Sequence, residues 1–314
     1  MFQKFDKNSD GVLDAGEIAA LASTPFGGTG TNKNRPAPDI SLKLPDSITQ
    51  VSGVVYGKGG TSDLLLDYIQ PKKKEGRLPV VVFVHGGGWQ SGSRMQSLRQ
   101  LVPLVEDGYF GVSIDYRLSG EAIFPAQIED CKCAIRYLRA NAETLGIDTN
   151  RIGVWGSSAG GHLVALLGTA GDKKEFEGSG GWQGHSSRVA AVCDWFGPSD
   201  LFTMGDFPSK LKHNAPDSPE SMLIGGALKE NKDKAQNASP LTYVSADDPP
   251  FLIMHGDKDE IVPYNQSEIL FAALKKAGVD VTFIPVPGEG HGFRSQEPAA
   301  TAKKFFDRVL KGKK

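Results

Sequence analysis

The chain has 314 residues, of which 39% are apolar and 23% are charged, and its formal net charge is -2. These values are typical of a soluble globular protein of one large α/β domain or two smaller domains, and they exclude the strongly basic surface that binds nucleic acids or anionic membranes. No apolar run is long enough to predict a transmembrane helix, and no signal peptide is expected before the first motif. Two of the three cysteines, Cys131 and Cys133, lie two residues apart in a helical pattern, so a disulfide scaffold is not expected.

The first 23 residues carry a partial EF-hand. Residues 6–17 match its twelve-residue calcium loop, with Gly11 at the sixth position for the sharp turn. The expected calcium ligands offer side-chain oxygens or a backbone carbonyl: Asp6, Asn8, Asp10, Val12, Asp14 and Glu17. The entering helix is reduced to residues 1–5, so the segment is either the remnant of an EF-hand pair or a calcium site that anchors the N-terminus. A calcium loop favours export, whereas an untrimmed N-terminus favours the cytoplasm.

The rest of the chain predicts one α/β domain over residues 49–314, after a linker at 24–48 that is rich in glycine, proline and asparagine. Two strand-like runs around the glycine-rich segment 57–60 predict a hairpin at a sheet edge. Strands are expected at 49–56, 63–69, 80–84, 109–115, 151–156, 189–196, 251–256 and 279–285, and helices at 95–106, 125–142, 159–167, 265–277 and 297–310. This alternation predicts a mostly parallel, doubly wound sheet with helices on both faces.

Two stretches interrupt the alternation, at residues 171–188 and 198–240. Both leave the sheet near the carboxyl ends of central strands, where ligands bind in open α/β sheets. The second is expected to be a lid-like insertion, because long irregular segments in compact domains are usually functional. Its larger apolar side chains are expected either to cover the site or to pack on the core as part of an ordinary helical excursion: Phe202, Met204, Phe207, Met222 and Leu223.

The strand at 151–156 runs into the sequence Gly156-Ser157-Ser158-Ala159-Gly160, and an apolar helix follows. A G-x-S-x-G pattern between a strand and a helix is typical of a nucleophile elbow. The serine of such an elbow has strained backbone angles, and the strand and helix approach too closely for side chains at the two flanking glycines. Only Ser158 has a glycine two residues before it and two residues after it, so Ser158 is the predicted nucleophile.

A glycine triplet in the sequence His85-Gly86-Gly87-Gly88-Trp89 follows the buried strand at 80–84. Consecutive glycines let backbone N–H groups turn toward one point, where they can stabilise negative charge on a carbonyl oxygen. We expect the N–H groups of Gly87, Gly88 and Ala159 to form such an oxyanion hole, at the positive end of the helix after the serine. A phosphate-binding loop is the alternative, but the lysine and the Ser/Thr of a P-loop are absent.

Six histidines compete for the role of general base. His291 is the predicted base, because the glycines on both sides of it let its imidazole reach across the sheet to Ser158. The other five lie in the glycine loop, on the nucleophile helix, in two loops without a supporting pattern and before a tight turn: His85, His162, His185, His213 and His255. The first two of these are expected to have structural hydrogen bonds.

The base requires a carboxylate to orient it, and three acids follow the strand at 251–256. Asp259, which lies past the turn, is the predicted partner. Asp257 is expected to cap or brace the turn, and Glu260 to face solvent. Asp194, at the end of the preceding strand, is a further alternative. The order Ser158, Asp259, His291 is that of α/β-hydrolases.

From about residue 52 onward the sequence resembles α/β-hydrolase esterases of the hormone-sensitive-lipase kind, and most closely their bacterial feruloyl-esterase-like branch. The resemblance lies in six motifs, at residues 85–89, 115–118, 124–130, 156–163, 259–263 and 290–293. It implies an α/β-hydrolase fold, a Ser-His-Asp triad, no cofactor for catalysis and a serine carboxylesterase acting on small acyl or aryl esters, such as the acetyl or feruloyl esters of plant polysaccharide. Similar proteins also include formamidases. The N-terminal helical cap usual in the hormone-sensitive-lipase group is not seen here.

Five aromatic residues are candidates to line the substrate pocket, although each could equally pack in the core: Trp89, Trp182, Trp195, Phe196 and Phe293. Three classes of function remain. The first is a carboxylesterase for small-molecule or polysaccharide-linked esters. The second is an amidase, formamidase or peptidase on the same fold, and the third is a non-catalytic, calcium-dependent binding module. The complete set of triad residues argues against the third. The oligomeric state stays open.

Overall fold

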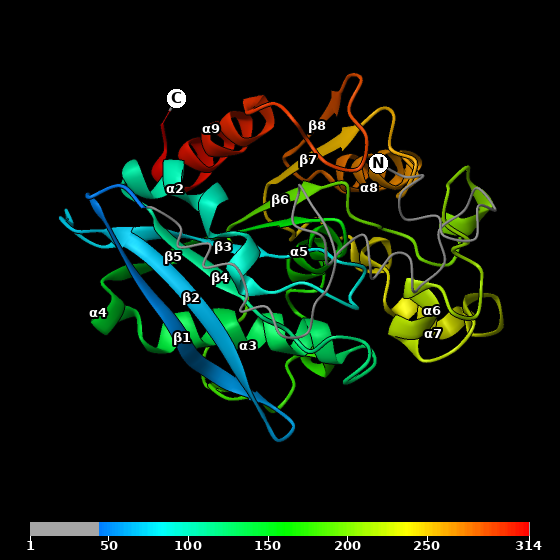
Figure 1. The fold of residues 1–314 in the computed structure, drawn as a ribbon, viewed down its shortest axis with the longest axis horizontal. Coiled ribbons are helices and arrows are strands. Elements are labelled where there is room, and N and C mark those ends of the chain that lie inside the picture. The colour runs from blue at the N-terminus through cyan, green and yellow to red at the C-terminus, as the bar shows by residue number, and fades with distance from the viewer. Residues whose placement is uncertain (1–43, 314) are drawn as a thin grey trace, which may run out of the picture.

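The structure is a computed structural model that describes residues 44–313 (Figure 1). At its centre lies an eight-stranded sheet with the order β1-β2-β4-β3-β5-β6-β7-β8. The strands are β1 (Ile48–Gly59), β2 (Ser62–Pro71), β3 (Leu78–Val84), β4 (Phe110–Ile114), β5 (Ile147–Ser157), β6 (Ala191–Trp195), β7 (Phe251–Gly256) and β8 (Val281–Val286). Within the described residues, β2 runs antiparallel to both of its neighbours, β1 and β4, and the other neighbouring strands pair in parallel. The mostly parallel sheet predicted from the sequence is confirmed.

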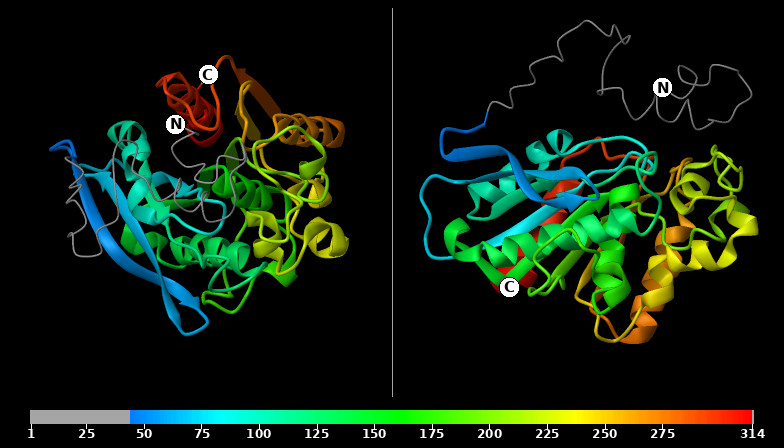
Figure 2. Two further views of the ribbon diagram at one scale, coloured as in Figure 1. Left: turned by 45° about the vertical axis from the view of Figure 1, so that its right-hand side comes forward. Right: turned by 90° about the horizontal axis from the view of Figure 1, so that it is seen from below.

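Helices cover both faces of the sheet (Figure 2). On one face lie α2 (Leu98–Glu106) and α9 (Glu297–Lys311), and on the other lie α3 (Ala126–Ala140), α5 (Ala159–Thr169) and α8 (Asn265–Ala277). The shorter helices are α4 (Ala142–Leu145), α6 (Pro219–Ile224) and α7 (Lys232–Asn237). Single 3₁₀ turns occur at Arg94–Gln96, Lys174–Phe176, Met204–Asp206, Leu228–Glu230 and Pro240–Tyr243.

Several helices and strands begin or end at other residues than the sequence predicted. β5 begins at Ile147 rather than at residue 151, because Ile147 pairs with Leu78 of β3. The helix predicted at 95–106 starts with a 3₁₀ turn and becomes α-helical only at Leu98. The helix predicted at 125–142 is two helices, α3 and α4, which meet at Asn141. The strands of the edge hairpin continue through most of the glycine-rich segment, so the turn between them is shorter than expected.

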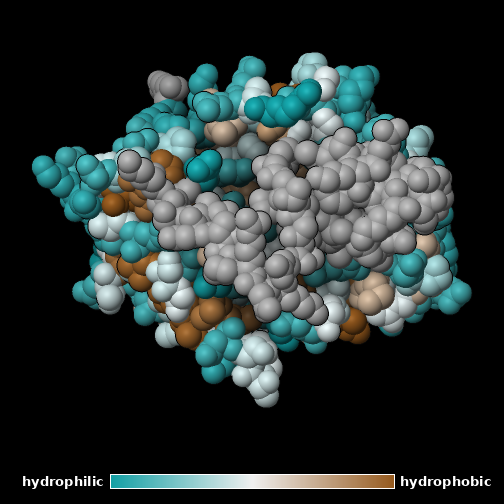
Figure 3. All heavy atoms as spheres, in the orientation of Figure 1, coloured by the Kyte–Doolittle hydropathy of each residue, from teal (hydrophilic) through white to brown (hydrophobic). Residues whose placement is uncertain are grey.

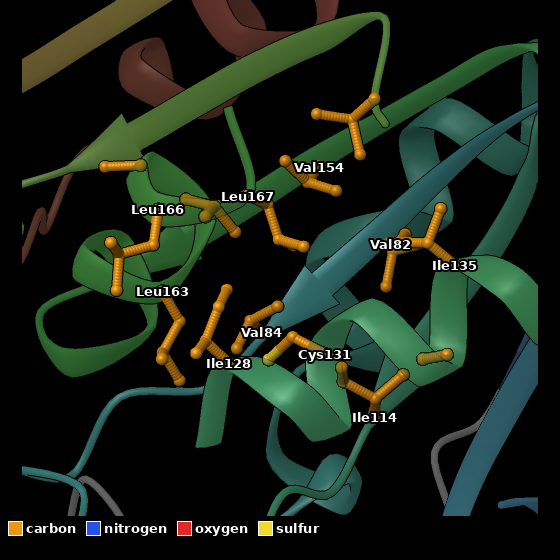
Figure 4. Close-up of a cluster of buried hydrophobic side chains, with 14 of the residues drawn as sticks. Val82, Val84, Ile114, Ile128, Cys131, Ile135, Val154, Leu163, Leu166 and Leu167 are labelled. Carbon is orange, nitrogen blue, oxygen red and sulfur yellow. The ribbon is translucent and has the colours of Figure 1, made fainter. Parts of the chain in front are cut away.

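The central strands are buried because helices cover both sides of them. All seven residues of β3 are buried, and their side chains alternate between the two faces of the sheet. Val82 and Val154 belong to the apolar cluster under α3 and α5 (Figure 4), whereas Phe83 and Trp155 belong to the cluster under α2 and α9. Each such side chain contributes about 2 kcal/mol by leaving water. This core holds the carboxyl ends of the parallel strands together at one edge, where the candidate site lies.

The predicted lid-like insertion at 198–240 connects β6 to β7, and its helices α6 and α7 lie at one end of the sheet (Figures 1 and 2). Its five apolar residues do not share one environment. Met204 and Leu223 are fully buried and Phe202 is half-buried, whereas Phe207 and Met222 are exposed. A single apolar cover made by all five is therefore wrong, because two of these side chains are packed inside the protein.

The surface of the described residues carries scattered apolar side chains. Figure 3 shows several over the β1–β2 hairpin, where Val51 and Val55 are exposed. No helix within residues 44–313 is both long enough and apolar enough to cross a membrane. The predicted EF-hand segment (1–23) and most of the predicted linker (24–48) lie outside the described residues.

Candidate active site

Ser158 lies on the sharp turn between β5 and α5. Its backbone angles are φ 56° and ψ -124°, which residues with a side chain rarely adopt. A Cβ on Gly156 would lie 2.2 Å from the carbonyl oxygen of Gly160, and a Cβ on Gly160 would lie 2.1 Å from that of Val84. The strand and helix therefore approach so closely that only glycine fits on either side of Ser158, as expected for a nucleophile elbow.

The structure brings Ser158, His291 and Asp259 together. Nε2 of His291 lies 2.9 Å from Oγ of Ser158, and Nδ1 of His291 lies 2.8 Å from Oδ2 of Asp259. The side chain of Asp259 has no exposed surface, whereas that of His291 is 20% exposed. Because the N–H at Nδ1 donates a hydrogen bond to the buried carboxylate, the Nε2 atom faces Ser158 and can accept its hydroxyl proton.

Four N–H groups hold the carboxylate of Asp259. Oδ1 accepts hydrogen bonds from the backbone of Ile261 at 2.8 Å and of Val262 at 3.0 Å. Oδ2 accepts from His291 and also from Nε2 of His255 at 3.1 Å. Burial alone would raise the pKa of Asp259, but the two histidines outweigh it and lower the pKa well below its usual range. The carboxylate therefore stays charged at neutral pH, as the orientation of a histidine base requires.

The other three acids have different partners. Asp257 accepts a hydrogen bond at 2.7 Å from a backbone N–H of the loop after β8, so it braces the turn as expected. Glu260 is 61% exposed and pairs with Lys210 at 2.6 Å. Asp194 is fully buried and accepts one backbone hydrogen bond, and burial raises its pKa to about 7. Within residues 44–313, no hydrogen bond or ion pair joins these acids to His291.

His85 and His162 have structural partners, as expected. Nδ1 of His85 lies 2.7 Å from a neighbouring carbonyl oxygen, and its ring stacks on Tyr116. Nε2 of His162 lies 2.6 Å from the carbonyl oxygen of Ala238, and its Nδ1 accepts the indole N–H of Trp89 at 3.2 Å. Burial lowers the pKa of His162 to about 4, so its ring is neutral and bridges α5 to the end of the insertion.

Two further histidines have buried partners that the sequence pattern did not reveal. His213, in the insertion, pairs with Glu220 at 3.0 Å, and both side chains are almost fully buried. His255 donates to Asp259 from the end of β7. The only sequence signal for this second contact is that both residues flank the turn at Gly256. His185 is exposed.

The glycine loop after β3 lies against the elbow. A Cβ on Gly86 would lie 3.2 Å from that of Ser158, and Gly87 and Gly88 have positive φ angles of 107° and 59° that turn the loop. No hydrogen bond in the described part of the chain uses the N–H of Gly87 or Gly88 as its donor. Ala159 is the first residue of α5, so its N–H has no acceptor within the helix. Donors are therefore available on both segments that flank Ser158, which an oxyanion hole requires.

Three of the five predicted pocket aromatics gather beside His291. The ring centroid of Phe196 lies 4.8 Å from that of His291. Phe293 packs on Phe196 and on Trp195, with centroids 5.1 Å and 4.9 Å apart. Trp195 and Phe196 are 5% exposed and belong to the apolar core, and Phe293 is half-buried. The three rings form an apolar wall in which Phe196 contacts the imidazole and Phe293 and Trp195 lie behind Phe196.

Trp89 and Trp182 have other surroundings. Trp89 is 1% exposed and belongs to the apolar core. The indole N–H of Trp182 donates to the carbonyl oxygen of Tyr56 in β1 at 2.7 Å, and its ring packs on Tyr137 of α3. Among the hydrogen bonds and ring contacts of residues 44–313, neither tryptophan contacts His291. Position in the sequence could not separate these two from the other three, because the separation depends on how distant strands and helices pack.

A mostly parallel sheet with a serine on a strand-to-helix turn and with an aspartate and a histidine after the last two strands defines the α/β-hydrolase class. Residues 66–274 match the family model described as BD-FAE, and the chain belongs to this family.

The chain is 33% identical over 247 residues to Esterase LipQ of Mycobacterium tuberculosis, which is 78% of this chain and 57% of the relative. It thus spans little more than half the length of this curated relative. Among solved structures, a truncated carbohydrate esterase from gut microbiota is 36% identical with a TM-score of 0.77, covering 84% of this chain and 96% of the other. Esterase Est2 of Thermogutta terrifontis with bound propionate is 29% identical with a TM-score of 0.69, covering 82% and 93%.

Proposed function

We propose that this protein is a serine carboxylesterase. The observation that carries the proposal is the continuous hydrogen-bonded line from Ser158 through His291 to Asp259, with contacts of 2.9 Å and 2.8 Å. A serine in such a line is activated as a nucleophile by its histidine base. The names of the relatives, which include a bacterial esterase and a carbohydrate esterase, support the same reaction.

In the proposed reaction, Nε2 of His291 accepts the hydroxyl proton of Ser158, and the serine oxygen attacks the carbonyl carbon of the ester. The N–H groups of Gly87, Gly88 and Ala159 stabilise the oxyanion that forms. His291 then gives its proton to the alcohol oxygen as the ester bond breaks. Water attacks the acyl-enzyme with help from the same base, which releases the acid and restores the serine.

We infer that the substrates are short acyl or aryl esters carried by carbohydrate, with acetyl and feruloyl esters of plant polysaccharide as the first candidates. The apolar wall of Trp195, Phe196 and Phe293 beside His291 supports a small acyl or aromatic group at this position. One solved relative is a carbohydrate esterase and another holds propionate, which supports short acyl groups and carbohydrate esters.

A panel of esters tests the proposal: p-nitrophenyl esters of rising acyl length, methyl ferulate and acetylated xylan. We expect the fastest hydrolysis on the short-chain members, and a loss of roughly four or more powers of ten in Ser158→Ala. A matched p-nitroanilide separates an esterase from an amidase or peptidase. A fluorophosphonate probe should label the wild type and not the variant. A folded protein that stays unlabelled and hydrolyses no ester would refute the proposal and favour a binding module.

We also propose that the loop at residues 6–17 binds Ca²⁺. The oxygen-bearing residues at the expected loop positions support this site. Among residues 44–313, no group of three or more His, Cys, Asp or Glu is placed to hold a metal ion. Calorimetric titration of the full chain should give a binding heat with CaCl₂ that is lost in Glu17→Gln. A wild-type protein that gives no heat at millimolar calcium would exclude the site.

A further inference from the structure

His255 lies directly behind the pair formed by Asp259 and His291. It occupies the end of β7, and its side chain has no exposed surface. Its Nε2 atom lies 3.1 Å from Oδ2 of Asp259, the same oxygen that accepts Nδ1 of His291 at 2.8 Å. One carboxylate oxygen therefore accepts hydrogen bonds from two histidines, one buried and one that reaches Ser158.

The contacts of His255 determine where its proton lies. Nε2 faces two acceptors, the carboxylate of Asp259 and the carbonyl oxygen of Val262 at 3.1 Å, so Nε2 carries a hydrogen. Nδ1 lies 2.7 Å from Oγ of Ser267 in α8, a hydroxyl group that can donate to it. Both ring nitrogens are thus occupied within the buried site. His255 has no nitrogen left for Ser158, which excludes it as the general base.

The two oxygens of Asp259 are held in different ways. Backbone N–H groups of the turn after β7 bind Oδ1, and they fix the position of the carboxylate. Among the residues that the structure describes, only the two histidine side chains bind Oδ2. The hydrogen bond from His255 draws negative charge toward itself, and it thereby reduces the attraction of Oδ2 for a protonated His291 ring. His255 is therefore placed to control how readily His291 becomes protonated.

We propose that His255 is a positioning residue that acts on the base through Asp259, by donating a second side-chain hydrogen bond to the oxygen that orients His291. This inference rests on the proposed function, because that function assigns His291 as the base. The consequence is that the base stays unprotonated, and hence active, to a lower pH than it would beside a carboxylate bound by one histidine alone.

Asparagine and glutamine give a matched pair of variants, because each amide replaces a different half of the imidazole. The amide of His255→Gln reaches the position of Nε2 and keeps a donor for Asp259. The shorter amide of His255→Asn reaches only the position of Nδ1, so it keeps the contact with Ser267 and loses the donor to Asp259. A histidine that only filled space or braced β7 would respond in the same way to both substitutions.

The first readout is the pH dependence of kcat/KM for a p-nitrophenyl ester. In His255→Asn we expect the acid limb to move toward higher pH by roughly half a unit to one unit, while His255→Gln follows the wild type. Loss of one hydrogen bond to a carboxylate accounts for a shift of this size. An acid limb that moves equally in both variants, or in neither, would overturn the inference.

The second readout is NMR of the histidine rings, which requires no hydrolysis. In the wild type, ¹⁵N spectra should show His255 protonated at Nε2, and a ring protonated only at Nδ1 would overturn the inference even if no variant folds. The Nδ1 proton of His291 should move downfield in His255→Asn and return in His255→Gln. If these resonances behave as expected while the wild type hydrolyses no ester, the esterase proposal fails and the hydrogen-bonding role of His255 stands.

Discussion

Asp194 should make the stability of this protein depend on pH. It is fully buried at the end of β6, where Oδ1 accepts the backbone N–H of Gly197 at 2.9 Å and Oδ2 has no hydrogen-bond partner among the described residues. Burial raises the pKa of Asp194 to about 7, and the single backbone hydrogen bond offsets only part of this effect. The folded protein therefore keeps Asp194 protonated at pH values where the unfolded chain has already ionised it.

The sign of the effect follows from counting protons. Between about pH 4 and pH 7 the folded state holds one proton more on Asp194 than the unfolded state does, so this residue lowers the free energy of unfolding as pH rises. The gap between the ordinary aspartate pKa of 3.8 and about 7 corresponds to about 4 kcal/mol over the whole range. Asp194→Asn keeps the shape of the protonated side chain and cannot ionise. The free energy of unfolding of this variant should therefore not show the decrease with rising pH that Asp194 causes.

Urea unfolding from about pH 5 to about pH 8 measures the effect. The free energy of unfolding of the wild type, relative to Asp194→Asn, should fall by about 1.4 kcal/mol per pH unit up to pH 7 and then level off. Asp217→Asn is the matched control, because Asp217 is exposed, and its stability should follow that of the wild type. Parallel curves for the wild type and Asp194→Asn would refute the reasoning.

Four further substitutions test other parts of the structure. Gly160→Ala should cost several kcal/mol of stability in urea unfolding, since its Cβ would lie 2.1 Å from a carbonyl oxygen of β3, and a variant as stable as the wild type would contradict the close approach. Burial lowers the pKa of His213, but the charge of Glu220 outweighs burial and raises that pKa above 6.5. The free energy of unfolding of the wild type, relative to Glu220→Gln, should therefore decrease as pH rises from about 6.5 through the raised pKa of His213. Trp182→Ala should leave kcat/KM on small esters unchanged, whereas Phe293→Ala should lower kcat/KM at least severalfold. Equal effects of the two substitutions would contradict the assignment of Phe293, and not Trp182, to the apolar wall beside His291.

The fold and the core of the site could be predicted because local rules determine them. A run of β-branched residues such as 80–84 predicts a buried parallel strand, and helices that alternate with such strands predict covered faces. The glycines around Ser158 are required by one sharp turn, so they are visible within five residues of sequence. The chain order of serine, aspartate and histidine follows from the order of the strands, and it needs no knowledge of packing.

The parts that could not be predicted depend on contacts between distant segments. The sequence of the lid-like insertion suits a cover over the site with five apolar residues, but Met204 and Leu223 are fully buried. Apolar residues of this kind can form either a cover over a site or part of the core, and only tertiary packing determines which of the two they form. In the sequence, the tight turn after His255 gives no sign of a role in the site, yet that turn brings Asp259 back to the ring of His255. Sequence spacing shows that a turn is present but not which side chains it joins.

The turn at Asp259 also connects the insertion to the candidate site. The N–H of Ile261 donates to Oδ1 of Asp259, while its carbonyl oxygen lies 3.0 Å from Nε2 of His213 in the insertion. A single residue of the chain thus contacts the carboxylate on one side and the insertion on the other. The strand β7 contributes His255 to the opposite oxygen of the same carboxylate. The orientation of Asp259 therefore depends on two separate parts of the fold, and a change in the insertion can reach His291 without any contact with the serine or the substrate.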